Sequence, residues 1–414
     1  MRAEVWDEVR ETLHDKVLEH LQESCADQRK SDQEICRVIR EILVEYARDH
    51  PMDLEDRVQM ERELFNSMRK LDILQDLLEE DTITEIMING HENIFLEERG
   101  KIRRLNRRFS SEEKLADLVQ QMVASTNTLV NESRPIADTR WKDGSRIHIV
   151  LPPVAVDGIM VSIRRFPRKG IGMDQLLELG SISEEIRDFL ADLVRAGYNI
   201  FISGGTGSGK TTFLNALSEF IPGSERVVTI EDSAELRLTG IDNLVRLEAR
   251  EAGMDGNLEV SIRELVRTAL RMRPDRIIVG ECRGSEALEM LQAANTGHDG
   301  TLGTGHANST ADMVSRLVTM VLMGNVSLPM PAILSQIASG IDIFIHLGRL
   351  RDGSRKLLEI NEVLGMEEGQ VKLSCLYRYE ADAGEEVRGQ WKRVNALQRR
   401  GKLQRAGMTE GSGC

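Results

Sequence analysis

The fold is decided by the stretch Gly204-Gly205-Thr206-Gly207-Ser208-Gly209-Lys210-Thr211. An apolar run, Ile200–Ile202, precedes it, and Phe213–Leu217 follows it with a helical composition. Every fixed position of the phosphate-binding pattern G-x-x-x-x-G-K-[ST] is filled. Glycines allow backbone N–H groups to approach a phosphate without a Cβ clash, and the start of a helix adds unpaired N–H groups. The stretch therefore predicts a strand, a phosphate-binding loop and a helix, rather than a flexible glycine linker.

The loop also predicts its cofactors, ATP and Mg²⁺. Lys210 is expected to reach the β- and γ-phosphates, and the Thr211 hydroxyl is expected to coordinate Mg²⁺. The predicted nucleotide-binding residues are Gly204, Gly205, Thr206, Gly207, Ser208, Gly209, Lys210, Thr211 and Thr212. The loop does not show which process the nucleotide drives.

Composition limits the class of protein. The 414 residues include 54 basic and 68 acidic side chains, a formal net charge of −14, which argues against a dedicated nucleic-acid coat. We find no apolar run of transmembrane length and no signal-peptide pattern, so we expect a cytoplasmic protein with at most peripheral membrane contact. The five cysteines form no C-x-x-C pair, which favours reduced thiols over a zinc site.

Three amphipathic segments are predicted before residue 73. Apolar residues recur every three or four positions across residues 5–21, 35–46 and 54–71, which is the spacing of one buried helix face. We interpret residues 1–72 as an N-terminal helical module for packing or interaction.

Residues 73–165 show the short, alternating runs that are typical of strands. Strands bounded by Asn-Gly, Arg-Gly and Asp-Gly turn signals are expected at residues 85–88, 93–96, 101–105, 145–151 and 159–164. A helix is expected to begin after Ser110. We predict a small α+β domain here, followed by a linker at residues 166–170.

Strands and helices alternate from residue 171 to residue 366. With a phosphate-binding loop after one strand, this alternation predicts an α/β domain with a doubly wound, mainly parallel sheet. Residues 367–414 are polar and include basic runs at 388–393 and 399–402. We expect them to form a polar C-terminal extension with a solvated basic tail, rather than a binding patch.

Acidic side chains follow two further apolar strands. Glu231 and Asp232 end the strand at 227–231, and Glu281 ends the strand at 277–280. Because parallel strands direct their carboxyl ends to one crevice, these carboxylates are expected beside the loop. We predict that Asp232 and Glu281 join the Mg²⁺ shell, partly through water. Glu281 is our preferred base for the attacking water, with Glu231 as the alternative.

Two histidines in glycine-rich segments follow in the sequence. His298 lies in Thr296-Gly297-His298-Asp299-Gly300, and His306 lies in Thr304-Gly305-His306-Ala307-Asn308. Their position after Glu281 favours a sensor of the γ-phosphate over surface histidines. The absence of nearby cysteines at ligand spacing disfavours zinc.

These four segments resemble the Walker A, Asp, Walker B and His boxes of the secretion-superfamily ATPases, which have a RecA-like core. That superfamily drives type II and type IV secretion and the assembly of type IV pili. Residues 271–281 and 295–300 are most similar to the CpaF/TadA branch of the tight-adherence (Tad/Flp) pilus systems. The resemblance extends from about residue 71 to residue 350.

The resemblance implies a homo-hexamer that works with inner-membrane platform proteins at the cytoplasmic face of the membrane. It also implies that an arginine of the domain before the loop meets the γ-phosphate. Our candidates are Arg140, Arg146 and Arg164, each of which could instead be a surface arginine.

Three other functions are compatible with the sequence. A type IV secretion or DNA-uptake ATPase would share the same boxes, although the acidic balance disfavours a nucleic-acid motor. A nucleotide-gated scaffold with negligible turnover is a second alternative, and a small-molecule P-loop kinase is a third. The sequence does not identify the pilin, the exported substrate or the direction of work.

Overall fold

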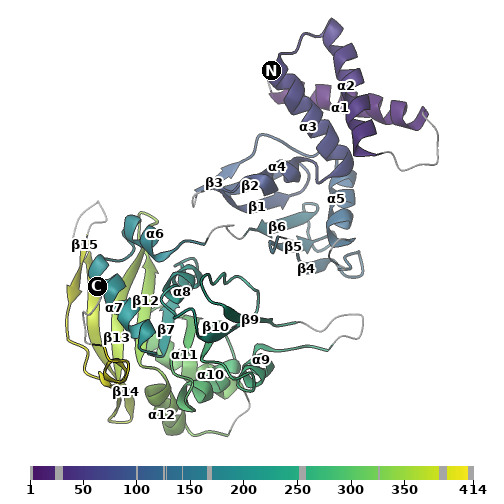
Figure 1. Cartoon of the computed structure of the whole chain (residues 1–414). Coiled ribbons are helices and arrows are strands. Elements are labelled where there is room, and N and C mark those ends of the chain that lie inside the picture. Colours follow the sequence, from purple (N-terminus) through teal and green to yellow (C-terminus); the bar gives the residue numbers. More distant parts are fainter. Residues whose placement is uncertain are drawn as a thin grey trace. The chain divides into compact units, whose positions relative to one another are not determined.

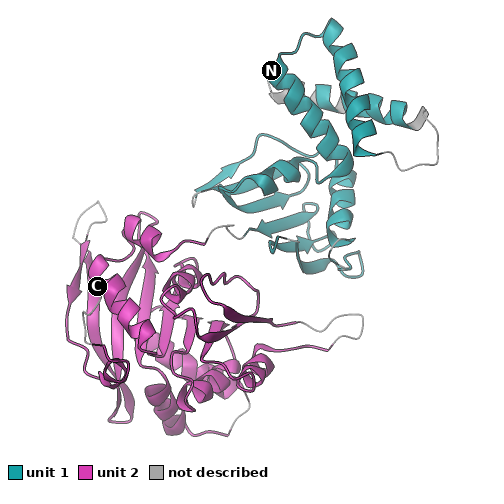
Figure 2. Ribbon diagram, viewed as in Figure 1, with its two compact units in different colours: residues 1–168 teal, residues 169–414 magenta. Residues whose placement is uncertain are grey.

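The computed structural model divides the chain into two compact units, residues 1–168 and 169–414 (Figure 2). It describes residues 3–23, 31–98, 101–124, 126, 128–141, 143–165, 170–250, 258–324, 327–381 and 389–408. The expected linker at 166–170 lies outside the described residues except for Gly170. Within the described residues, no helix is long and apolar enough to cross a membrane.

The first unit begins with three helices, α1 (Ala3–Glu23), α2 (Asp32–Asp49) and α3 (Leu54–Arg69). Their apolar stripes meet in one core that includes Leu13, Ile39 and Leu64. The Ser31 hydroxyl accepts a hydrogen bond from the Glu34 backbone N–H, and the Glu34 carboxylate accepts one from the Ser31 N–H, which caps the start of α2.

The rest of the first unit is a six-stranded antiparallel sheet with helices on one face (Figure 1). Alternate strand residues such as Ile86, Ile147 and Ile163 pack with the helices in a second core. Its strand order is β3-β2-β1-β6-β5-β4. The elements are α4 (Ile73–Glu79), β1 (Ile83–Asn89), β2 (Asn93–Glu98), β3 (Lys101–Arg104), α5 (Glu112–Ala124), β4 (Ile136–Arg140), β5 (Arg146–Val150) and β6 (Met160–Arg164). A domain boundary near residue 72 stays a prediction.

The second unit is built on a nine-stranded sheet of order β15-β14-β13-β12-β7-β11-β10-β8-β9. The strands from β12 to β9 are parallel, and the three beyond β12 are antiparallel. This mainly parallel, RecA-like sheet confirms the predicted fold class. The strands are β7 (Ile200–Gly204), β8 (Arg226–Glu231), β9 (Asn243–Glu248), β10 (Arg276–Cys282), β11 (Leu302–His306), β12 (Ile343–Arg349), β13 (Arg355–Glu367), β14 (Gln370–Ala381) and β15 (Gly389–Arg393).

Helices cover both faces of this sheet (Figure 1). Strand β7 shows why, because Ile200 and Ile202 enter one core while Phe201 enters the other. Helices α6 (Met173–Glu178), α7 (Glu184–Arg195) and α8 (Lys210–Ser218) line the first core. The second core is lined by α9 (Ile262–Ala269), α10 (Glu286–Asn295), α11 (Thr310–Met323) and α12 (Met330–Gly340).

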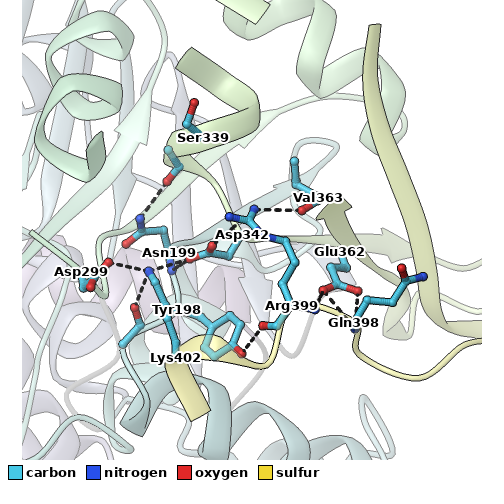
Figure 3. A network of polar contacts seen from close by, with 12 residues as sticks. Tyr198, Asn199, Asp299, Ser339, Asp342, Glu362, Val363, Gln398, Arg399 and Lys402 are labelled. Carbon is cyan, nitrogen blue, oxygen red and sulfur yellow. Dashed lines mark hydrogen bonds and ion pairs between the residues drawn. The ribbon is translucent and has the colours of Figure 1, made fainter. Parts of the chain in front are cut away.

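Residues 389–408 form a strand and a short helix, and most of their side chains, including most of the basic ones, are exposed to solvent. Strands β14 and β15 extend the sheet, and the last helix, α13 (Gly401–Arg405), is anchored at the amino edge of the parallel strands. Figure 3 shows the anchor: the buried Glu362 carboxylate accepts hydrogen bonds from the backbone N–H groups of Gln398 and Arg399. Lys402 Nζ lies 2.7 Å from Asp342 Oδ2 and 2.6 Å from Asp299 Oδ1. Composition alone does not reveal these distant carboxylates.

Replacing Lys402 by Met should destabilise the second unit. The Asp342 side chain is only 8% exposed, and it would lose its lysine partner. Breaking a buried ion pair costs about 3 kcal/mol or more, which lowers the melting midpoint by about 6–12 °C in a unit of this size. Calorimetry of the full-length protein measures the shift.

The matched control is Lys392→Met. Lys392 pairs with Glu380 at the surface, where both side chains are about half exposed. Such a pair contributes about 0–1 kcal/mol. Equal shifts in the two variants would contradict a stabilising role for the Lys402 anchor.

Candidate active site

The phosphate-binding loop begins where β7 ends and leads directly into α8. Gly207 and Gly209 have φ values of 71° and 91°, a left-handed conformation that favours glycine. A Cβ atom on Gly204 would lie 2.5 Å from both the Leu347 carbonyl oxygen and Ser208 Oγ. The loop therefore needs glycine at these three positions for conformational or steric reasons.

Lys210 is the first residue of α8 and is only 7% exposed. Its Nζ donates a hydrogen bond of 3.0 Å to the Gly205 carbonyl oxygen and lies 3.2 Å from His306 Nδ1. Burial lowers the pKa of Lys210, and the nearby Glu281 carboxylate opposes that shift. The ammonium group thus lies over the first residues of the loop, beside a histidine.

His306 and Glu281 come together because their strands are neighbours in the sheet. His306 ends β11, where it is in register with Gly204, and Glu281 lies near the end of the adjacent β10. His306 Nε2 is 2.7 Å from Glu281 Oε1. The Thr304 hydroxyl donates a hydrogen bond of 2.7 Å to the Gly280 carbonyl oxygen, which ties the two strands together. A continuous chain of contacts therefore links Lys210, His306 and Glu281.

Arg283 connects the second carboxylate to this chain. Its guanidinium donates a hydrogen bond of 2.8 Å to Glu281 Oε2, and its other terminal nitrogen lies 3.6 Å from Asp232 Oδ2. The Glu281 carboxylate raises the pKa of Arg283, which remains a permanent cation. Asp232 and Glu281 thus both contact the guanidinium of Arg283.

Glu231 has a different environment from Glu281. It is 3% exposed, and its Oε2 accepts two hydrogen bonds of 2.8 Å, from the backbone N–H groups of Glu235 and Leu236. Burial raises its pKa to about 7, although the two backbone N–H groups oppose the shift. Glu231 therefore holds the segment after β8, which includes Asp232. This environment suits a positioning residue better than a base that must meet water.

The oxygen donors suit Mg²⁺ that is bound together with a nucleotide. Among the described residues, no three His, Cys, Asp or Glu side chains gather as a metal site. Mg²⁺ commonly keeps several waters and binds through one or two protein oxygens plus substrate phosphates. Thr211 lies in the first turn of α8, and Asp232 and Glu281 both contact Arg283, so these oxygens are the candidates for that kind of donor set.

A cavity of about 460 Å³ opens beside the loop and His306. Its opposite wall is the exposed face of α11. The lining residues are Gly205, Thr206, His306, Ala307, Asn308, Asp312, Ser315, Arg316 and Thr319.

The prediction for the two histidines is wrong for His298. It precedes β11, whereas His306 ends that strand, so the two histidines lie at opposite edges of the parallel sheet. The neighbouring Asp299 pairs with Lys402 in the C-terminal anchor. A glycine precedes each histidine, and the sequence pattern could not distinguish a residue before the strand from one at its end.

The three candidate arginines of the first unit lie side by side. Arg164, Arg146 and Arg140 are register partners on β6, β5 and β4. Arg164 is also paired in register with Glu85, and Arg146 Nε donates a hydrogen bond of 3.3 Å to Asp138. Because these arginines belong to the first unit, their action on a nucleotide at the loop stays a prediction.

Two arginines at the loop were not predicted from the sequence. Arg283 had a usable signal, because it stands two positions after Glu281 at the end of an apolar strand. Arg355, on β13, had none: its Nε donates a hydrogen bond of 2.8 Å to the carbonyl oxygen of Gly207, 148 residues earlier.

The RecA-like sheet, the loop and these boxes define the class of secretion-superfamily ATPases. Residues 67–374 match the family described as "Type II/IV secretion system protein", and the chain belongs to that family. It is 36% identical to a Mycobacterium tuberculosis protein with the provisional name conjugal transfer protein, over 75% of this chain and 89% of that one. It is 34% identical to the type IV secretion system protein PtlH of Bordetella pertussis, over 67% and 89%. The solved Legionella pneumophila ATPase DotB is 25% identical, with a TM-score of 0.50, over 71% and 80%.

Glu281→Gln should retain ATP binding and lose turnover. The amide keeps the shape of the side chain but cannot take a proton from water, a loss of about 10²–10⁴-fold. Binding of a fluorescent ATP analogue and steady-state phosphate release measure the two effects.

Glu231→Gln is the matched control. A glutamine oxygen can still accept the two backbone hydrogen bonds that hold the segment after β8. We expect turnover within about tenfold of wild type, because no positioned base is removed. An inactive Glu231→Gln beside an active Glu281→Gln would reverse the assignment of the base.

Proposed function

We propose that this protein hydrolyses ATP with Mg²⁺ to power a Tad/Flp-type (type IVb) pilus or a type II secretion-like system at the cytoplasmic face of the membrane. The main support for ATP hydrolysis is the chain of contacts from Lys210 through His306 to Glu281 beside the phosphate-binding loop. A lysine for phosphate beside a carboxylate for water is the pair that nucleotide hydrolysis requires.

Each residue has a defined part in the proposed reaction. Lys210 holds the β- and γ-phosphates, and Thr211 would hold a Mg²⁺ ion, which would neutralise part of their charge. Water attacks the γ-phosphorus, the bond to the bridging oxygen breaks, and ADP and phosphate leave. Glu281 accepts the proton of the attacking water. His306 contacts both Lys210 and Glu281, so a γ-phosphate that binds at His306 can change the position or charge state of both residues.

The ring and the arginines complete the proposal. Arg164, Arg146 and Arg140 lie side by side in register on three adjacent strands of the first unit. In a homo-hexamer whose units close over the nucleotide, one of them would stabilise the charge that develops on the γ-phosphate. The closing of the units would be transmitted to platform proteins of the inner membrane. The ring would associate peripherally with that membrane.

A type IV secretion or conjugation motor is the second candidate. It is supported by the names of two relatives, which refer to type IV secretion and to conjugal transfer. The Tad/Flp assignment is supported by the sequence of residues 271–281 and 295–300. Loss of surface pili in a strain without this gene would favour the first candidate, and loss of protein or DNA transfer with intact pili would favour the second.

A dilution series tests the ring and the role of the first unit. Specific ATPase activity of the full chain should rise with protein concentration, because hexamer formation follows mass action. A fragment of residues 169–414 should bind nucleotide but hydrolyse it about 10³–10⁵-fold more slowly, because it lacks the arginines of the first unit. If fragment and full chain are equally active at every concentration, the arginine proposal is wrong.

A further inference from the structure

One wall of the cavity beside the loop consists of residues that the proposed reaction does not use. This wall is the exposed face of α11, which contributes Asp312, Ser315, Arg316 and Thr319. Arg316 is the arginine in the lining, and it faces the same space as Gly205 and His306.

Helix α11 is held firmly, which fixes the position of Arg316. The Ser309 hydroxyl caps the helix by accepting a hydrogen bond from the Asp312 N–H. The Thr310 hydroxyl donates to Glu359 and accepts from Asn361, both on β13. On the opposite face, apolar side chains such as Met313 and Leu317 are fully buried. Arg316 therefore stands on a rigid element rather than on a loop.

The cavity lies at the terminal-phosphate end of the loop. The loop lysine of this motif reaches the β- and γ-phosphates. Lys210 Nζ lies 3.0 Å from the Gly205 carbonyl oxygen and 3.2 Å from His306, and both of these residues line the cavity. A terminal phosphate on Lys210 would therefore border the space that Arg316 lines.

Arg316 is available for such a ligand. None of the residues described in the structure forms an ion pair with it. Its charge reaches the site, because burial, Lys210, Arg283 and Arg316 together lower the pKa of His306, against the Glu281 carboxylate. Asp312, one turn earlier on the same face, has the opposite charge, so the wall is not a general anion trap.

We propose that Arg316 contacts the terminal phosphate and lets the site distinguish ATP from ADP. The inference rests on the proposed ATP hydrolysis and assigns a specificity role within that site. A planar guanidinium can bind two phosphate oxygens at once, which a lysine cannot reproduce. The arginines of the first unit would then act on the rate, while Arg316 selects the nucleotide from within the second unit.

Nucleotide affinities of the full chain test this inference without any measurement of turnover. Arg316→Gln should weaken binding of a non-hydrolysable ATP analogue by about 10–100-fold, the effect of a lost charge-assisted hydrogen bond. ADP affinity should stay within about twofold, because ADP has no γ-phosphate. Arg316→Lys should give an intermediate loss.

Two further variants make the result specific. Arg271→Gln removes an exposed arginine that precedes β10, at the opposite edge of the sheet from the loop, and should change neither affinity. Asp312→Asn removes a negative charge from the same wall as Arg316. It should leave analogue binding equal or tighter.

The outcomes separate the inference from the function on which it rests. Unchanged analogue affinity in Arg316→Gln overturns the role of Arg316. Equal losses for the analogue and ADP, or a lowered melting midpoint, also overturn it, because they would indicate a structural role. If the wild-type protein binds neither nucleotide, the proposed function itself fails.

Discussion

The structure depends on the parallel register of three neighbouring strands, β7, β11 and β10. Because they run in the same direction, they end at one edge of the sheet, where Gly204, His306 and Glu281 come within reach of one another. The loop then turns Lys210 back over that edge. A slip of one residue in β11 would turn His306 toward a core, which breaks the link between lysine and carboxylate.

Charged residues at the two edges of the same sheet have different roles. At the amino edge, Lys402 contacts Asp299, Asp342 and the Gly197 carbonyl oxygen, so its charge is fully compensated and the contact is structural. At the carboxyl edge, Lys210 contacts the Gly205 carbonyl and His306, and both of these residues line a cavity that is open to a ligand. The difference lies in how completely each charge is paired, and it separates stabilising residues from the candidate site.

The sequence predicted the local parts of this architecture well, because each rests on a short motif. The loop and the carboxylates at the ends of β8 and β10 follow from residues that are adjacent in the chain. Contacts between distant residues were not predictable in this way: Arg355 meets the loop across 148 residues, and Lys402 meets Asp342 across 60. His298 was misassigned because a histidine preceded by glycine looks the same on either side of a short strand. The pairing of strands, rather than composition, determines which distant residues meet and at which edge of the sheet a residue lies.

The proposed activity requires that the terminal phosphates bind where Lys210, His306 and Glu281 meet. An experimental structure of the full-length protein with Mg²⁺ and a non-hydrolysable ATP analogue tests it most directly. We predict phosphate oxygens within about 3 Å of Lys210 Nζ, the distance of a charge-assisted hydrogen bond. We also predict that the γ-phosphate borders His306 and that Mg²⁺ lies near Thr211. A nucleotide bound elsewhere, with Lys210 still on the Gly205 carbonyl, would contradict the account.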